Sequence, residues 1–191
     1  FEPLPYAHEA EAGVFWNKFD CSEQEFLHLR GRFPGFQAVT AYKTNDMTIR
    51  EGDAPARLLP GIAATAELFD VLGAPPLLGR AFRAGDDAEG AEPVVVLSWG
   101  LWQELGGNAD IVGQRLTLDG EPRTVVGVMP RGFWFPNPSV RLWMPEPLDP
   151  ENGSGNYALV GRVAPGGDVR ALTGPVAQLT KILDERFDYP E

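Results

Sequence analysis

The stretch of residues 93–133 restricts the possible folds of this chain more than any other part of it. It begins with the apolar run Val-Val-Val-Leu at 94–97, which predicts a buried strand. Ser98 follows directly and is expected to cap a short helix that ends at the glycine pair 106–107. A strand leading straight into a capped helix indicates a packed domain.

The second half of the same stretch predicts a hairpin. Two strand-like runs, 115–118 and 123–128, flank Asp119-Gly120, a pair typical of tight turns between antiparallel strands. The polar residues here all have structural roles in turns and caps. The stretch therefore indicates a folded, non-catalytic module.

Charge and composition exclude several functional classes. The chain has 191 residues, 43% of them hydrophobic, with five Trp, and such a chain buries roughly 70% of its unfolded surface. Its 27 Asp plus Glu outweigh 16 Lys plus Arg, for a net charge of -11. A sequence-independent nucleic-acid contact needs a basic face, so nucleic acid is not expected as a partner. Docking on anionic lipid is disfavoured for the same reason.

The cysteine count and the hydropathy are also informative. Cys21 is the single cysteine, so no disulfide can form within the chain. No apolar run approaches the roughly 20 residues of a membrane helix. The sequence opens at Phe1 without an initiator Met or signal-like segment, and we expect it to be part of a longer protein.

The elements outside this stretch predict an α+β order. Ser22 and Glu25 form a capping box for a helix that carries Phe26, Leu29 and Phe33 and stops at Pro34-Gly35. Further expected elements are strands at 13–17, 36–42, 47–51, 57–63 and 157–163, a helix at 66–72 capped by Thr65 and ended by Gly73, and a final helix after Asp168 with Val169, Leu172, Val176, Leu179 and Leu183 on one face, interrupted by Gly174-Pro175. Residues 130–155 are expected to be loop.

No group of residues forms a convincing reaction centre or metal site. His8 and His28 lack companion ligands at metal-binding spacing. Ser98 lacks the first glycine of a nucleophile elbow. The acidic loop at 86–89 lacks the ligand spacing of a calcium loop and is expected to be solvated. We therefore predict no enzyme activity, no cofactor and no metal.

Three aromatic residues in the proline-rich segment are the candidate partner contacts. Trp134, Phe135 and Trp143 lie where periodicity gives no placement. Such residues either pack a long loop or form an exposed patch for a partner, and packing is the favoured interpretation. Of Trp99 and Trp102, at least one is expected in the core.

Several segments together resemble one family, the MacB-like periplasmic core domain of FtsX-type ABC transporter permeases, and within it the "orphan" permease group. The segments are 22–42 (Ser-Glu-Gln-Glu-Phe-Leu…Phe-Gln-Ala-Val-Thr-Ala-Tyr), 67–87 (Leu-Phe-Asp-Val-Leu-Gly…Leu-Leu-Gly-Arg-Ala-Phe), 93–133, 142–145 (Leu-Trp-Met-Pro) and 160–166 (Val-Gly-Arg-Val-Ala-Pro-Gly). Each is weak alone, but their joint order is specific. The interrupted final helix and the proline-rich residues 130–150 depart from the family pattern.

The resemblance implies a two-lobed α+β domain between two membrane helices. A porter-like split βαβ lobe would come from residues 1–58 and 152–191, and a sabre-like inserted lobe from 59–151. The domain would be non-catalytic and would face the periplasm from the cell inner membrane. It would relay ATP-driven motion of the membrane helices to substrates or partners outside. The implied partners are an ABC-type ATPase subunit, a second permease copy and a periplasmic adaptor or transported substrate. The membrane would be contacted only through the flanking helices.

Two other functions remain as alternatives. A secreted binding module for glycans or peptides would use Trp134, Phe135 and Trp143 as an aromatic platform. A secreted hydrolase is disfavoured because no nucleophile or acid–base pair converges in the sequence.

Overall fold

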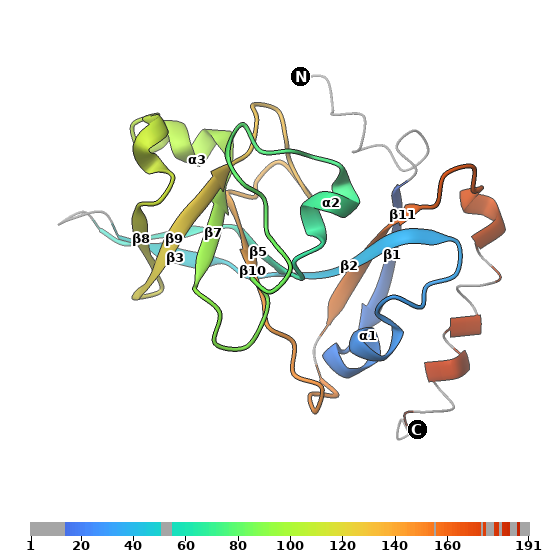
Figure 1. Ribbon diagram of the computed structural model, residues 1–191. Helices are drawn as coiled ribbons and strands as arrows, with labels where there is room; N and C mark the ends of the chain where they lie inside the picture. Colours follow the sequence, from blue (N-terminus) through green and yellow to red (C-terminus); the bar gives the residue numbers. More distant parts are fainter. Residues whose placement is uncertain are drawn as a thin grey trace.

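The computed structural model describes residues 14–50, 55–154, 156–172, 174, 178–179, 181–183 and 187. These residues form an α+β fold around one mixed sheet, as predicted (Figure 1). The strands are β1 (Val14–Cys21), β2 (Phe36–Thr44), β3 (Met47–Ile49), β4 (Arg57–Leu59), β5 (Gly61–Ala64), β6 (Leu78–Gly79), β7 (Val94–Leu97), β8 (Arg115–Leu118), β9 (Glu121–Val128), β10 (Leu142–Pro145) and β11 (Tyr157–Val163). The helices are α1 (Glu23–Leu29), α2 (Leu68–Leu72) and α3 (Trp99–Glu104), with short 3-10 turns at η2 (Ala109–Ile111) and η3 (Val169–Leu172).

One side of the molecule is built from both ends of the described chain. Strand β11 lies between β1 and β2 and pairs antiparallel with each. Helix α1 packs on this layer through Phe26, which contacts a small core containing Cys21, Ala41 and Tyr157. The segment after β11 returns beside α1, where Leu179 and Leu183 pack against Leu29.

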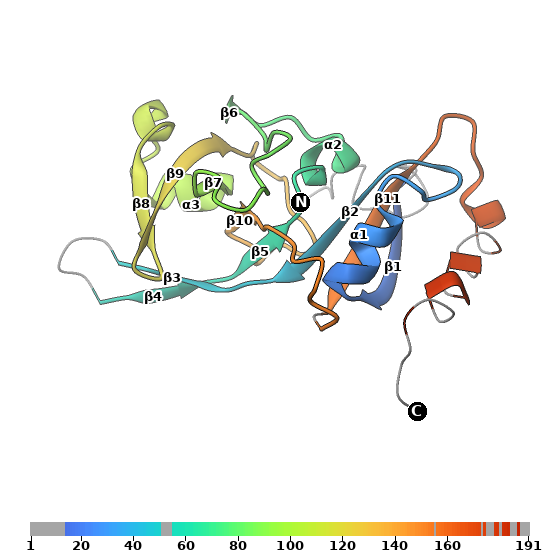
Figure 2. The same cartoon turned by 60° about the horizontal axis from the view of Figure 1, so that its bottom comes forward.

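The other side is a curled part of the same sheet. Pairing runs from β5 through β10, β7, β9, β8 and β3 to β4. Only Pro60 separates β4 from β5, so the last strand of this series leads directly into the first and the series closes into a ring. The Pro60 carbonyl accepts a hydrogen bond from the Arg141 amide at this junction. Figure 2 shows β2 and β3 running on from one another alongside β4 and β5, so this long ribbon joins the two sides.

Strand β7 separates two hydrophobic cores. Val95 and Leu97 point into the barrel core inside the ring, together with Ile49 and Leu118. Val94 and Val96 point the other way, into the core beneath α2, which we call the α2 core. All four β7 residues are therefore buried, which explains an apolar run without alternation.

The local signals of α3 and the hairpin are confirmed. The Ser98 hydroxyl accepts from the Leu101 amide, 3.1 Å away, and caps α3. Asp119 and Gly120 both take positive φ, 50° and 83°, as a tight turn between twisted strands requires.

The capping box of α1 is also confirmed, but its predicted end is wrong. Ser22 and Glu25 satisfy each other's backbone amides. The helix ends at Leu29, before Phe33, because the chain turns at Gly31 with φ 76°. Phe33 still packs against the core next to α1, from outside the helix.

The predicted cap of α2 is wrong as well. Thr65 turns away from the helix, and its hydroxyl lies 2.8 Å from that of Thr40 on β2. The helix has no side-chain N-cap, and the amide of Ala66, which precedes it, donates to the carboxylate of Asp87 from a distant loop. Gly73 ends the helix in the predicted left-handed conformation.

Strand β10 lies within residues expected to be loop. It occupies the middle of the sheet, parallel to β5 and antiparallel to β7. All four of its residues are buried, so its sequence carries no alternating pattern.

The remaining expectations concern the C-terminal segment and the lobes. After β11 the described helical residues include buried Leu172, Leu179 and Leu183, whereas Pro175 and Val176 lie outside the described residues. No helix in the described part of the chain has the length and apolarity to cross a membrane. The division at residues 58 and 151 stays a prediction, since β2 and β5 pair directly across it.

Candidate partner surface

The three candidate aromatics occupy different environments. Phe135 and Trp143 are 2% and 0% exposed, and both belong to the α2 core. The Trp143 indole Nε1 donates to the Phe135 carbonyl at 3.1 Å, which satisfies the one polar atom of the ring. These two rings therefore pack a long loop and are out of reach of a partner at the surface. Trp134 is half-buried and remains available.

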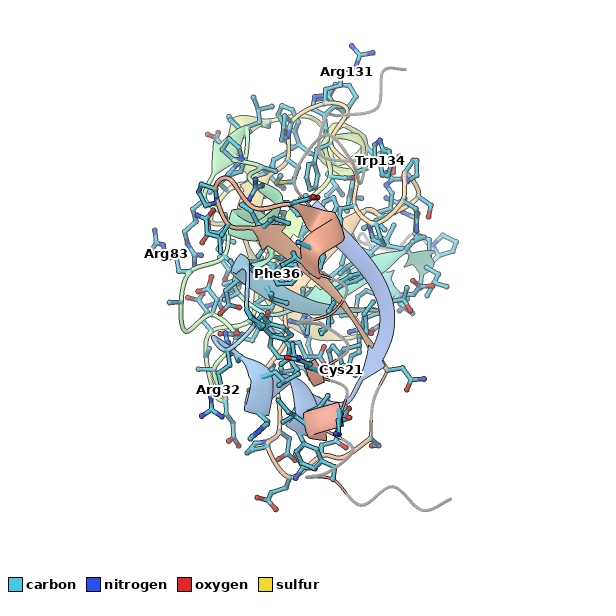
Figure 3. All side chains as sticks on the ribbon, turned by 90° about the vertical axis from the view of Figure 1, so that its right-hand side faces the viewer. Cys21, Arg32, Phe36, Arg83, Arg131 and Trp134 are labelled. Atoms are coloured by element: carbon cyan, nitrogen blue, oxygen red, sulfur yellow. The ribbon has the colours of Figure 1, made fainter. Side chains whose placement is uncertain are left out.

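Trp134 lines a groove of about 350 Å³. Its walls come from the β7–α3 corner and from the loop after β9, which places Trp99 opposite the segment 131–134. Its floor includes Phe133 and Val140, which are 6% and 5% exposed. Figure 3 shows Arg131 and Trp134 near the same end of the molecule, away from Arg32.

The floor of this groove rests on the aromatic part of the α2 core. The Phe133 and Trp143 ring centroids lie 5.2 Å apart, and Phe69 contacts both rings. Edge-to-face packing of this kind holds rings in fixed orientations. The loop that carries Trp134 is therefore supported from beneath.

Arginine side chains give the groove its charge. The Arg131 guanidinium lies over the Trp99 ring, 5.2 Å from its centroid. Arg141 donates to Glu104 at 2.6 Å, and Arg57 shares the same carboxylate at 3.0 Å. Hydrogen bonding from Arg141, opposed by burial and reinforced by Arg57, lowers the pKa of Glu104. Glu104 is therefore ionised and already occupied by two cations.

The sequence prediction missed Trp99 and Arg131 as members of this site. At least one of Trp99 and Trp102 was expected in the core. Both are partly exposed, and Trp102 packs against the barrel core. The available sequence signal was that a Trp-containing segment lies on each side of the hairpin. No rule of sequence spacing predicts that these two segments contact one another. Their contact depends on β7 and β9 being neighbours in the sheet.

The candidate catalytic and metal-binding residues have structural partners. Ser98 caps α3. Asp86 forms an ion pair with Arg80, and Asp87 with Arg30. No group of His, Cys, Asp or Glu suited to a metal ion occurs in the part of the chain that the structure describes. His28 contacts the Phe187 ring edge-on, and His8 lies outside the described residues.

Cys21 is fully buried at the end of β1. Burial, reinforced by the nearby charge of Glu25, raises the pKa of its thiol to about 12. The thiolate is the reactive form, so this cysteine is expected to be inert.

This predicts slow labelling of the folded protein. At pH 8 we expect a thiol reagent to modify native Cys21 roughly a thousandfold more slowly than the unfolded chain, because far less thiolate is present. Because the pKa of the Cys21 thiol is higher in the folded protein, the thiol's contribution to the stability of the fold is complete below the pKa that it has in the unfolded chain. That contribution is lost as the pH rises towards 12. Absorbance-monitored labelling with and without urea measures the ratio; equal rates would show that the thiol is accessible.

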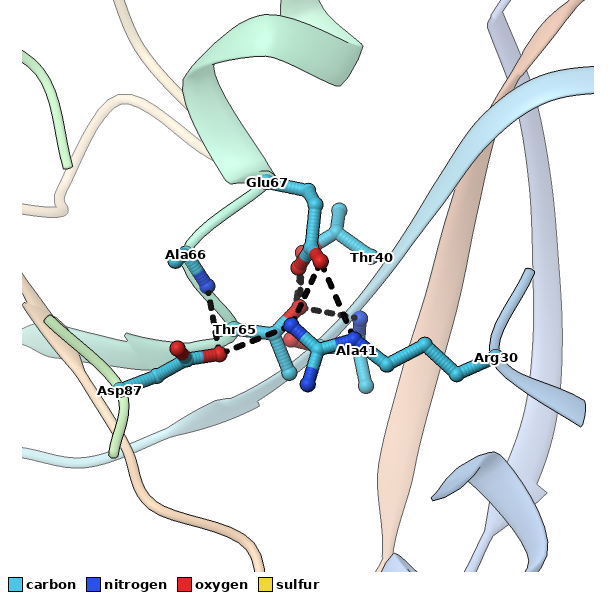
Figure 4. Close-up of polar contacts among 7 residues, drawn as sticks. All are labelled: Arg30, Thr40, Ala41, Thr65, Ala66, Glu67 and Asp87. Carbon is cyan, nitrogen blue, oxygen red and sulfur yellow. Dashed lines mark hydrogen bonds and ion pairs between the residues drawn. The ribbon is translucent and has the colours of Figure 1, made fainter. Parts of the chain in front are cut away.

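A polar clamp joins α1 to the α2 region (Figure 4). The Arg30 guanidinium donates to Glu67 Oε1 from Nε at 3.0 Å and from Nη2 at 2.5 Å, and to Asp87 Oδ2 at 3.0 Å. Burial alone would lower the pKa of Arg30, but hydrogen bonds and charge from Glu67 and Asp87 raise it. Beside the clamp, Thr65 also accepts from the Ala41 amide at 3.4 Å. The clamp therefore ties the two sides of the sheet together next to the β2–β5 pairing.

Comparison with known families accounts for the two-sided curled sheet. The family model described as "MacB-like periplasmic core domain" matches residues 6–179. The chain belongs to this family. MacB-like periplasmic core domains are the periplasmic portions of ABC transporter permeases, so the sequence resemblance is confirmed. None of the curated proteins compared with the sequence matches it.

Solved structures share the MacB-like fold. The extracellular domain of the noncanonic ABC-type transporter YknZ from Gram-positive bacteria is 17% identical with a TM-score of 0.65, covering 91% of this chain and 92% of that one. The periplasmic region of MacB from Actinobacillus actinomycetemcomitans is 17% identical with a TM-score of 0.64, covering 91% and 82%. A domain of a putative permease from Porphyromonas gingivalis is 18% identical with a TM-score of 0.62, covering 92% and 83%. At these identities the likeness shows the fold alone.

Proposed function

We propose that this MacB-like domain is a non-catalytic, extracytoplasmic relay. In the parent permease it would carry ATP-driven motion of the membrane helices to substrates or partner proteins outside the membrane. The observation that carries the proposal is the family match over residues 6–179. ATP would be hydrolysed by a separate ABC-type ATPase, and the domain would move against a second permease copy at the inner membrane.

The internal construction supports a relay that moves as a stiff body. One continuous sheet spans both sides, and the β2–β3 and β4–β5 ribbon crosses between them. The Arg30 clamp adds a second connection, between α1 and the α2 region. A domain built in this way transmits a displacement with little internal change. The porter-like and sabre-like lobes, proposed at 1–58 with 152–191 and at 59–151, would then act together.

Distance measurements between spin labels test this relay in the full-length permease with its ATPase. Arg32 and Arg83 are exposed and lie on the two segments that the Arg30–Asp87 ion pair joins, and Figure 3 labels both along one edge of the molecule. Both are suitable for replacement by cysteine. Native Cys21 is buried and need not be removed. With Arg32→Cys alone, the distance between copies should change by several ångströms when ATP is trapped. In chains carrying both labels, diluted with unlabelled copies, the Arg32–Arg83 distance should stay constant.

A catalytically inactive ATPase subunit is the matched control and should abolish the change between copies. An unchanged distance between copies in the trapped state would contradict the relay. A large change within one copy would contradict stiff-body motion while leaving the coupling itself intact.

A further inference from the structure

The groove at Trp134 has the composition of a protein-binding hot spot. Its lining includes Trp99, Trp134, Arg131 and Pro138 above a buried apolar floor. Trp and Arg are the residue types that contribute most binding energy at protein interfaces, particularly where they surround a well-packed pocket. Among the described residues, the Arg131 guanidinium and the Trp99 ring form a cation–π contact with each other and no ion pair or aromatic pair with a side chain outside the groove lining.

The groove is cationic, although the chain as a whole is strongly acidic. Arg131 and Arg141 line it against the single carboxylate of Glu104, whereas the net charge of the chain is -11. Arg141 is engaged by Glu104, so Arg131 is the cation left without an ion pair among the described residues. A guanidinium held over a Trp ring can still donate N–H hydrogen bonds from its free edge to a carboxylate.

A second groove provides a contrast. It lies between the loop 86–93 and the end of β10 and is lined by Asp86, Glu92 and Glu146 beside Arg123. Asp86 is paired with Arg80 and Glu146 with Lys43, but three carboxylates against one lining arginine still favour an anionic ligand less than the Trp134 groove does. The two grooves therefore differ in charge, and the Trp134 groove is the one that favours an acidic ligand.

We propose that the Trp134 groove binds an extended acidic segment of a partner protein. A carboxylate side chain of the segment pairs with Arg131, and an apolar or proline side chain packs against Trp99 and Trp134. The open, aromatic-walled groove suits an extended peptide, whose successive side chains point to opposite sides and can therefore reach both walls of the groove. This contact supplies a partner surface to the proposed relay and does not depend on the relay being correct.

Binding of synthetic peptides to the 191-residue chain tests the proposal. The probe is a fluorescein-labelled peptide of alternating Glu and Leu with one central Pro, compared with versions carrying Gln or Lys in place of Glu. Fluorescence anisotropy should show the Glu peptide binding about tenfold more tightly than the Gln peptide, with the preference shrinking as salt is raised. The Lys peptide should bind least.

Matched variants locate the contact. Arg131→Ala and Trp134→Ala should each weaken binding of the Glu peptide about tenfold. Arg115→Ala removes an equal charge from exposed β8 and should leave binding unchanged. Glu104→Gln, which releases Arg141 from its ion pair and so adds a second available cation to the groove, should strengthen binding. Circular dichroism establishes that each variant is folded, and Arg131→Lys replaces Arg131→Ala if the latter is not.

Three outcomes would overturn the proposal. They are failure of the Glu peptide to bind, equal binding of the Glu and Gln peptides, and full binding by the Trp134→Ala variant. Binding of neutral oligosaccharides or of vesicles containing anionic lipid, in place of the Glu peptide, would also overturn it and would assign the groove to that ligand.

Discussion

Replacing Trp143 with alanine is expected to lower the free energy of unfolding by about 3–5 kcal/mol, the loss typical of a buried aromatic residue. The ring is fully buried among Phe69 and Phe133, and its indole donates to the Phe135 carbonyl. Alanine would leave a cavity at the centre of the α2 core and remove the hydrogen bond to the Phe135 carbonyl. Urea denaturation monitored by far-ultraviolet circular dichroism measures the change.

Trp99→Ala is the matched control for this experiment. Trp99 is partly exposed and contacts Arg131, so its loss should cost about 1 kcal/mol or less. Trp143→Phe, which keeps most of the apolar volume, should fall between the two and remains measurable if Trp143→Ala does not fold. Equal losses from Trp99→Ala and Trp143→Ala would be inconsistent with a buried Trp143.

Arg30→Ala is expected to have the second largest effect, a loss of about 1–3 kcal/mol. Arg30 binds both Glu67 and Asp87, and the Asp87 side chain is 9% exposed. Removing the guanidinium leaves two carboxylates close together and without their cation. The estimate stays below that for a fully buried pair because Arg30 itself is 35% exposed.

Arg32→Ala separates the clamp from the change in net charge. It removes the same charge from a neighbouring exposed position and should change stability by less than about 0.5 kcal/mol. In the spin-label experiment, Arg30→Ala should broaden the Arg32–Arg83 distance within one copy. A stability loss no larger than that of Arg32→Ala would show that the clamp is a surface ion pair of little consequence.

The parts of the fold that followed from the sequence depend on neighbouring residues. The Ser22–Glu25 capping box, the Ser98 cap and the Asp119-Gly120 turn are each complete within four residues. Hydrogen bonds between residues this close in the chain are determined by the local sequence, so they can be predicted without knowledge of the tertiary structure.

The parts that were mispredicted depend on distant residues. Thr65 has the chemistry of an N-cap, but its hydroxyl contacts Thr40 and the Ala41 amide on β2, and the helix begins without a side-chain cap. Asp87 accepts only from the Ala66 amide, which precedes the helix. Strand β10 is buried on both faces and flanked by prolines, so neither alternation nor length distinguished it from loop. Its two pairing partners are remote in the chain.

The candidate site was predicted only in part for a similar reason. The sequence indicated an aromatic segment, yet Trp134 faces the groove while Phe135, the next residue, faces the core. Which ring of such a pair is buried depends on the path of the loop over the α2 core. The pairing of Arg131 with Trp99 joins two segments through the neighbouring strands β7 and β9, and only the sheet order reveals it.

The position of β11 between β1 and β2 has a consequence for how the domain is made. During synthesis β1 and β2 leave the ribosome before the strand that pairs with both of them, which follows all the other strands of the sheet. Until it arrives, each of the two early strands lacks the neighbour that joins them. The layer that includes α1 therefore forms as a late event, and a chain cut short before residue 157 would retain both outer strands without their centre.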